Sequence, residues 1–190
     1  MALAASSMDA WDSFYVIVGS SAGALTGLQF VVVALTPESR NAPRSSEGLM
    51  AFGTPTIVHF CAVLLLAAVL SAPWPTLAAV ATAVAVCALG ALGYCVIVIR
   101  RALRQRDYQP VFEDWLWHTV FPVLGYAIQF AAALLLTTHP VAALFMLAVT
   151  ALLLIFAGIH NAWDAAVFIA LGNGAAAAPA ARDGRRDTAS

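Results

Sequence analysis

Five long stretches of the chain contain almost no charged side chain, and they constrain the fold more than any other feature. They are residues 13–35, 54–70, 76–99, 115–136 and 141–171. About 20 apolar residues in an α-helix are enough to cross the hydrocarbon core of a bilayer. The chain is 62% hydrophobic and 10% charged, whereas a soluble domain has about 25% charged residues. The sequence therefore predicts an all-α, polytopic membrane protein with five transmembrane helices in a compact bundle.

The basic residues predict how this bundle is oriented. All nine are arginines, and they lie in segments 36–53, 100–114 and 172–190. The other two connections, 71–75 and 137–140, carry no charge and are short enough to join antiparallel helices. With five spans, every arginine lies on one side of the membrane. Because positive charge is concentrated in cytoplasmic loops, the N-terminus is expected outside and the C-terminus inside.

Three segments make up the predicted organisation. Residues 1–12 form a short N-terminal segment, residues 13–171 the transmembrane domain, and residues 172–190 a disordered tail rich in Gly, Ala and Arg. No basic residue precedes the first apolar stretch, so a cleaved signal peptide is not expected. With a net charge of −1, the expected partner is the lipid bilayer rather than nucleic acid. The expected location is the cytoplasmic (inner) membrane of a bacterium.

Small residues mark the faces on which helices are expected to pack. Gly19, Gly23 and Gly27 recur at every fourth position of the first span, as in a glycine zipper, and Gly90 and Gly125 belong to similar small-residue seams in the third and fourth spans. Such seams let helix backbones approach closely in lipid. Packing within one bundle is the favoured interpretation of the first-span series, and a helix shared between copies is the alternative. Because the seams exceed what five helices need, a homo-oligomer is also predicted.

Polar and ionisable side chains inside the spans are the candidates for function, because they are costly in lipid. On a regular helix, His118, Pro122, Gly125 and Gln129 share one face of the fourth span. His160, Asn161 and Asp164 share one face of the fifth. Helix rise and the expected orientation bring several of these groups to similar depth near the inner boundary. The predicted ion or proton pathway comprises Gln29, His59, His118, Gln129, His160, Asn161 and Asp164.

The favoured function is a small homo-oligomeric channel or transporter in which the His/Asp cluster acts as a gate or ion site. A polar cap near the headgroups, with Trp163 as an interfacial anchor, is the structural alternative for His160 and Asp164, and Trp117 is expected to be a membrane-belt residue. No cofactor is predicted for transport. The redox alternative would use His59, His118, His160 and Asp164 to bind haem or a divalent metal.

Two further functional classes stand beside transport and redox activity. An accessory structural subunit of a larger membrane complex is the simplest alternative. An enzyme is disfavoured, because the chain has no nucleophile elbow and no phosphate-binding glycine loop after a strand. Cys61, Cys87 and Cys95 all lie in apolar stretches. Their number and spacing indicate small packing residues rather than a disulfide framework or a zinc site.

Overall fold

The computed structural model describes residues 8, 10–35, 43–104 and 115–183. Within these ranges the regular structure is helical throughout. The elements are α2 (Asp12–Leu35), α3 (Pro43–Ser71), α4 (Leu77–Arg104), the π-helical turn η1 (Leu116–Val120), α6 (Phe121–Leu135) and α7 (Pro140–Asp183). The predicted all-α class is therefore confirmed for the described residues.

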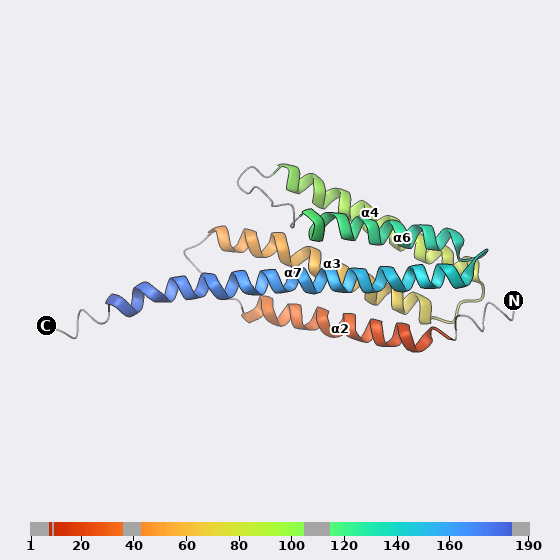
Figure 1. Ribbon diagram of the computed structural model, residues 1–190, viewed down its shortest axis with the longest axis horizontal. Coiled ribbons are helices and arrows are strands. Elements are labelled where there is room, and N and C mark those ends of the chain that lie inside the picture. The colour runs from red at the N-terminus through yellow and green to blue at the C-terminus, as the bar shows by residue number, and fades with distance from the viewer. Residues whose placement is uncertain (1–7, 9, 36–42, 105–114, 184–190) are drawn as a thin grey trace.

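Helix α7 is the central element of an elongated up-and-down bundle. It packs between α3 and α6, while α2 packs on α3 and α4 packs on α6 (Figure 1). Successive helices run in opposite directions, so α2, α4 and α7 point one way, and α3 and α6 the other. Over half of the apolar part of α7 is buried, against less than a fifth of α4. Of these two helices, α7 is therefore the one that the fold encloses more completely.

Four of the described helical segments are long and apolar enough to cross a membrane. They are Asp12–Val32, Leu77–Arg100, Leu116–Leu135 and Pro140–Val167. In α3 the corresponding stretch, Pro55–Ser71, is shorter, although α3 as a whole has 29 residues. Many large apolar side chains point outward, among them Ile17, Leu134 and Phe156, each more than 60% exposed. Such a surface suits lipid rather than water.

Local chemistry explains the two short connections. Thr76 precedes α4 and accepts a hydrogen bond from the amide of Ala79 through Oγ1 (3.2 Å), which makes it an N-cap. Trp74 donates its indole N–H to the carbonyl of Val69 (2.6 Å), so the residues between α3 and α4 fold back onto the end of α3. Pro140 begins α7, where its missing N–H and fixed φ are tolerated.

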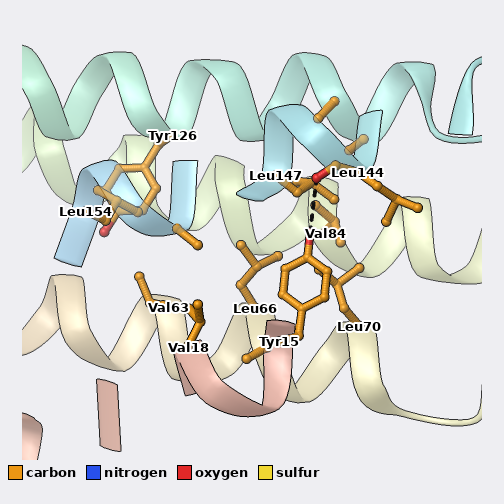
Figure 2. Packing of buried hydrophobic residues seen from close by; sticks show 14 of the residues in the cluster. Tyr15, Val18, Val63, Leu66, Leu70, Val84, Tyr126, Leu144, Leu147 and Leu154 are labelled. Carbon is orange, nitrogen blue, oxygen red and sulfur yellow. Dashed lines mark hydrogen bonds between the residues drawn. The ribbon is translucent and has the colours of Figure 1, made fainter. Parts of the chain in front are cut away.

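The core is built from apolar side chains of all these helices and is tied together by a tyrosine. Tyr15 of α2 is 3% exposed and donates its hydroxyl to the carbonyl of Leu144 in α7 (3.1 Å). Figure 2 shows this bond crossing the cluster in which Leu66, Leu70 and Leu147 are also buried. A buried tyrosine usually needs such a partner. Because the hydroxyl of Tyr15 is bonded to α7, this residue fixes α2 against α7.

The predicted packing glycines differ in their surroundings. A Cβ on Gly19 would lie 2.8 Å from Cβ of Ala67 in α3, and one on Gly125 would lie 3.3 Å from Leu154 in α7. Gly23 is looser, with Leu64 at 3.9 Å. Gly27 and Gly90 are exposed, and no described atom lies within 4 Å of the position that a Cβ would take.

Helix ends differ most from the predicted spans in two places. Helix α3 begins at Pro43, well before the predicted start at residue 54, and α7 continues to Asp183, beyond the predicted end at residue 171. Of the predicted tail, residues 184–190 lie outside the described residues, as do residues 1–7 and 9 of the predicted N-terminal segment.

Candidate functional site

A π-helical turn decides where the histidine of the fourth predicted span points. Pro122 has no N–H, so it cannot donate to the carbonyl of His118 as the α-helical pattern requires. The chain instead forms η1, in which the amide of Phe121 donates to the carbonyl of Leu116, five residues back. One extra residue in a turn rotates everything before it by about 100°. The regular face predicted for His118 and Pro122 is therefore broken between these two residues.

The rotation gives Trp117 and His118 different neighbours. Trp117 takes the position in line with Pro122 and stacks on His160 of α7, with ring centroids 4.0 Å apart and an interplanar angle of 23°. His118 instead lines a cavity beside α3 and α4. Trp117, predicted to be a membrane-belt residue, thus makes a specific contact with another helix. π-turns of this kind often mark functional sites.

The cavity is small and partly polar. Its volume is about 10 Å³, and it lies between α3, α4 and η1. Its polar lining comes from His59, Tyr94, Cys95, His118 and Thr119. Pro55, Val98 and Ile99 supply the apolar lining. A space of this size holds about one water molecule.

His59 is the most deeply buried ionisable group on this cavity. Its side chain is 1% exposed, and its Nδ1 lies 2.9 Å from the hydroxyl of Tyr126 in α6. Tyr126 is itself fully buried. The other ring nitrogen of His59, Nε2, has no hydrogen-bond partner among the described residues. The ring is therefore fixed at one nitrogen and available at the other.

His160 and Asp164 form the second part of the site. They are one turn apart on α7, and Nε2 of His160 lies 3.2 Å from Oδ2 of Asp164. The side chains are 26% and 50% exposed, so this pair lies at the surface of the bundle. The stack of Trp117 on His160 connects η1 to the pair. Between them, the carboxylate and the indole fix the position and the orientation of the imidazole.

Asn161 is an exception among the buried polar groups. It is fully buried in α7, and neither its Nδ2 nor its Oδ1 has a hydrogen-bond partner among the described residues. An unsatisfied buried amide costs free energy, about 1–3 kcal/mol. By contrast, Thr150, also fully buried in α7, donates to the carbonyl of Gly125 (3.2 Å). Asn161 therefore needs a partner such as water or a bound solute.

The structure brings some of the predicted pathway residues together and leaves others apart. His59 and His118 share the cavity, and His160 and Asp164 share an ion pair. Gln129 is buried in α6, one turn beyond Tyr126. Gln29 is half-buried on α2, and no described contact joins it to the histidines. His139 is exposed in the connection between α6 and α7, beside Thr138.

The haem and metal alternatives find little support in this geometry. The described residues include no group of three or more His, Cys, Asp and Glu side chains placed to hold a metal ion. The space between His59 and His118 is about 10 Å³, whereas small-molecule and cofactor pockets have about 300–1,000 Å³. These side chains are arranged for small polar contacts rather than for an axial haem pair.

Sequence analysis missed several residues on which the site depends. Tyr126 lies on the same regular face as Pro122 and Gln129, at spacings of four and three residues, so the helical pattern already contained its signal. The sequence held no comparable signal for the contact of Trp117 with His160, because only the π-turn brings these two rings together. Gly158 was also missed, although it allows the ring of Phe60 in α3 to lie directly against α7.

Comparisons with other proteins add nothing to this description. The chain matches no family model, no curated protein and no solved structure.

Proposed function

We propose that this protein is a small channel or transporter that carries protons or small cations along a polar path between α3, α4, α6, η1 and α7. The observation that carries the proposal is the set of buried polar groups that the bundle leaves unsatisfied. Asn161 is fully buried, and neither polar atom of its side chain has a hydrogen-bond partner among the described residues. His59 is also buried, and its Nε2 has no hydrogen-bond partner among the described residues. In a purely structural bundle these positions would favour apolar side chains.

The path begins at the exposed ion pair and continues inward. His160 and Asp164 are accessible at the surface of the bundle, and the stack of Trp117 on His160 leads to η1. The next residue, His118, lines the cavity that also contains His59. From His59 the hydrogen bond to Tyr126 continues into α6. Intramembrane ionisable groups in such a series are typical of ion and proton pathways.

The orientation and the assembly are part of the same proposal. With five spans, α3 included, the ends of the helices nearest His160 and Asp164 face the cytoplasm. The path then opens toward the inner side, in the inner membrane of a bacterium. The exposed glycines Gly27 and Gly90 suit contact with further copies, as expected for a homo-oligomer.

Flux through purified protein in liposomes tests the proposal. Vesicles containing a pH-sensitive dye and vesicles containing a K⁺-sensitive dye are compared with protein-free vesicles under an imposed gradient. The wild type is expected to carry one of these ions. Asp164→Asn is expected to reduce the flux, because it removes the charge that His160 contacts at the entrance.

The matched control is His139→Ala, which removes an exposed histidine in the connection between α6 and α7, away from the proposed path. It is expected to leave flux unchanged. Wild-type vesicles that behave like protein-free vesicles with both dyes would overturn the proposal. Equal flux in the wild type and Asp164→Asn would remove the His160–Asp164 pair from the path.

A further inference from the structure

His160 and Asp164 have nearly the spacing of two ligands of one metal ion. Nε2 of His160 lies 3.2 Å from Oδ2 of Asp164. In a tetrahedral zinc site, a histidine nitrogen and a carboxylate oxygen each lie about 2.0–2.1 Å from the metal, and therefore about 3.3–3.4 Å from each other. The two side chains are 26% and 50% exposed, so an ion can reach them. A third ligand is missing in this conformation, because the described residues include no group of three His, Cys, Asp or Glu placed to hold a metal ion.

The π-turn η1 directs a third histidine away from this pair. Trp117 stacks on His160, with ring centroids 4.0 Å apart, whereas His118, the next residue, lines the cavity beside α3 and α4. The amide of Phe121 donates to the carbonyl of Leu116, five residues back. An α-helical turn would use the carbonyl four residues back. The turn therefore contains one residue more than the α-helical turn that it replaces.

An α-helical form of this turn would move each residue of η1 into the place that its predecessor holds now. His118 would take the position of Trp117 opposite His160, and Thr119 would take the position of His118. Thr119 already lines the same cavity, so a hydroxyl is compatible with that place. Trp117 would take the half-buried position of Leu116. The exchange brings a histidine to the ion pair and leaves a polar group at the cavity.

Pro122 makes the π form the stable one as long as no ligand is bound. In the α form, its ring would press on the carbonyl of His118, which would also lack an N–H partner. Proline is nevertheless tolerated inside membrane helices, where the chain kinks around it. The α form is therefore a state of higher energy and is not excluded. A ligand that binds only the α form shifts the equilibrium toward it.

We infer that His118, His160 and Asp164 form a site for one Zn²⁺ or a similar divalent metal ion, and that binding converts η1 from the π to the α form. Two histidines and one carboxylate are a common ligand set for such ions, with a further position for water. The metal lies between Nε2 of His160 and Oδ2 of Asp164, and the ring of His160 keeps its proton on Nδ1. The site goes beyond the proposed transport function, because it follows from the geometry of η1 and α7.

Zinc binding and the conformation of η1 are measured on the full-length protein in lipid nanodiscs. Isothermal titration gives the affinity and the number of Zn²⁺ ions per chain. Fluorine-labelled tryptophan reports the surroundings of Trp117, whose NMR signal is assigned by its loss in Trp117→Phe. We expect one Zn²⁺ per chain and a shift of the Trp117 signal on binding. The signal of Trp74, in the connection between α3 and α4, is expected to stay in place.

Four substitutions identify the ligands and the change of conformation. His118→Ala and Asp164→Asn each remove a ligand and are expected to weaken Zn²⁺ binding by at least about tenfold, since losing even an outer-shell partner of a metal site costs that much. His139→Ala is the matched control and is expected to keep the wild-type affinity. Pro122→Ala restores the amide that the α form lacks. It is expected to shift the Trp117 signal without metal and to strengthen binding by at least about tenfold.

The inference is overturned if the wild type binds no Zn²⁺, or if His118→Ala or Asp164→Asn binds it with the wild-type affinity. It is also overturned if Zn²⁺ binds and the Trp117 signal stays unchanged, because His118 has then not taken its place. None of these measurements uses ion flux, so the metal site and the proposed transport function can each fail without the other.

Discussion

Gly158 of α7 and Phe60 of α3 are in such close contact that the glycine cannot be replaced without displacing the ring. A Cβ on Gly158 would approach Cε1 of Phe60 to 2.5 Å and Cζ to 2.9 Å. Phe60 is 1% exposed, so its ring has no free space into which to move. This contact sets the separation of the two helices that carry His59 and the His160–Asp164 pair. The polar site therefore depends on an apolar contact one residue away from His59.

Gly158→Ala is expected to lower the free energy of unfolding by about 1–3 kcal/mol, because it overpacks a rigid contact. Denaturant titration in mild detergent measures this change. The matched control is Gly93→Ala in α4, where no described atom lies within 4 Å of the new Cβ. There the substitution is expected to stabilise the helix by about 0.5–1 kcal/mol. The same sign of change in both variants would contradict the packing assigned to Gly158.

Tyr126→Phe is expected to destabilise the protein by about 1–3 kcal/mol, because it leaves Nδ1 of the buried His59 without a partner. The test is a double-mutant cycle with His59→Leu. Removing both partners should cost less than the sum of the two single substitutions, since no orphaned polar atom then remains. Strict additivity would show that the two side chains do not interact.

Asn161→Leu separates stability from transport. An apolar side chain of similar size removes a buried amide that has no described partner, so the midpoint of thermal unfolding is expected to stay constant or rise. Ion flux in liposomes is expected to fall, because this amide is one of the two unsatisfied buried groups on which the proposed transport function rests. A loss of stability together with unchanged flux would assign Asn161 a purely structural role.

Membrane topology tests whether α3 crosses the bilayer. Reporters are inserted in segment 36–42, in the connection 72–76 and after Asp183. With five spans, the first and third are expected to be cytoplasmic and the second external. Reporters in 36–42 and 72–76 that report the same compartment would show that α3 does not cross, even though its two ends lie at opposite ends of the bundle.

The sequence by itself determined the class of fold and the approximate position of every helix. Apolar stretches separated by charged or proline-containing segments specify membrane-type helices, because hydrophobicity and helix length are local properties. Thr76 and Pro140 are recognisable from sequence as signals for the start of a helix. The pairing of His160 with Asp164 was likewise readable from a spacing of four residues.

Tertiary structure decided which of these helical faces meet. Gly19 and Gly27 belong to one regular series, yet only Gly19 lies against a neighbouring helix, because α3 contacts α2 at that level and no described group reaches Gly27. The face predicted for His118 also assumed a continuous α-helix through this residue, whereas η1 turns it toward His59 and places Trp117 opposite His160. Pro122 made a break foreseeable, but not the size or direction of the rotation. Those depend on packing against α3, α4 and α7, and contacts between residues far apart in the chain are not encoded in the periodicity of any single helix.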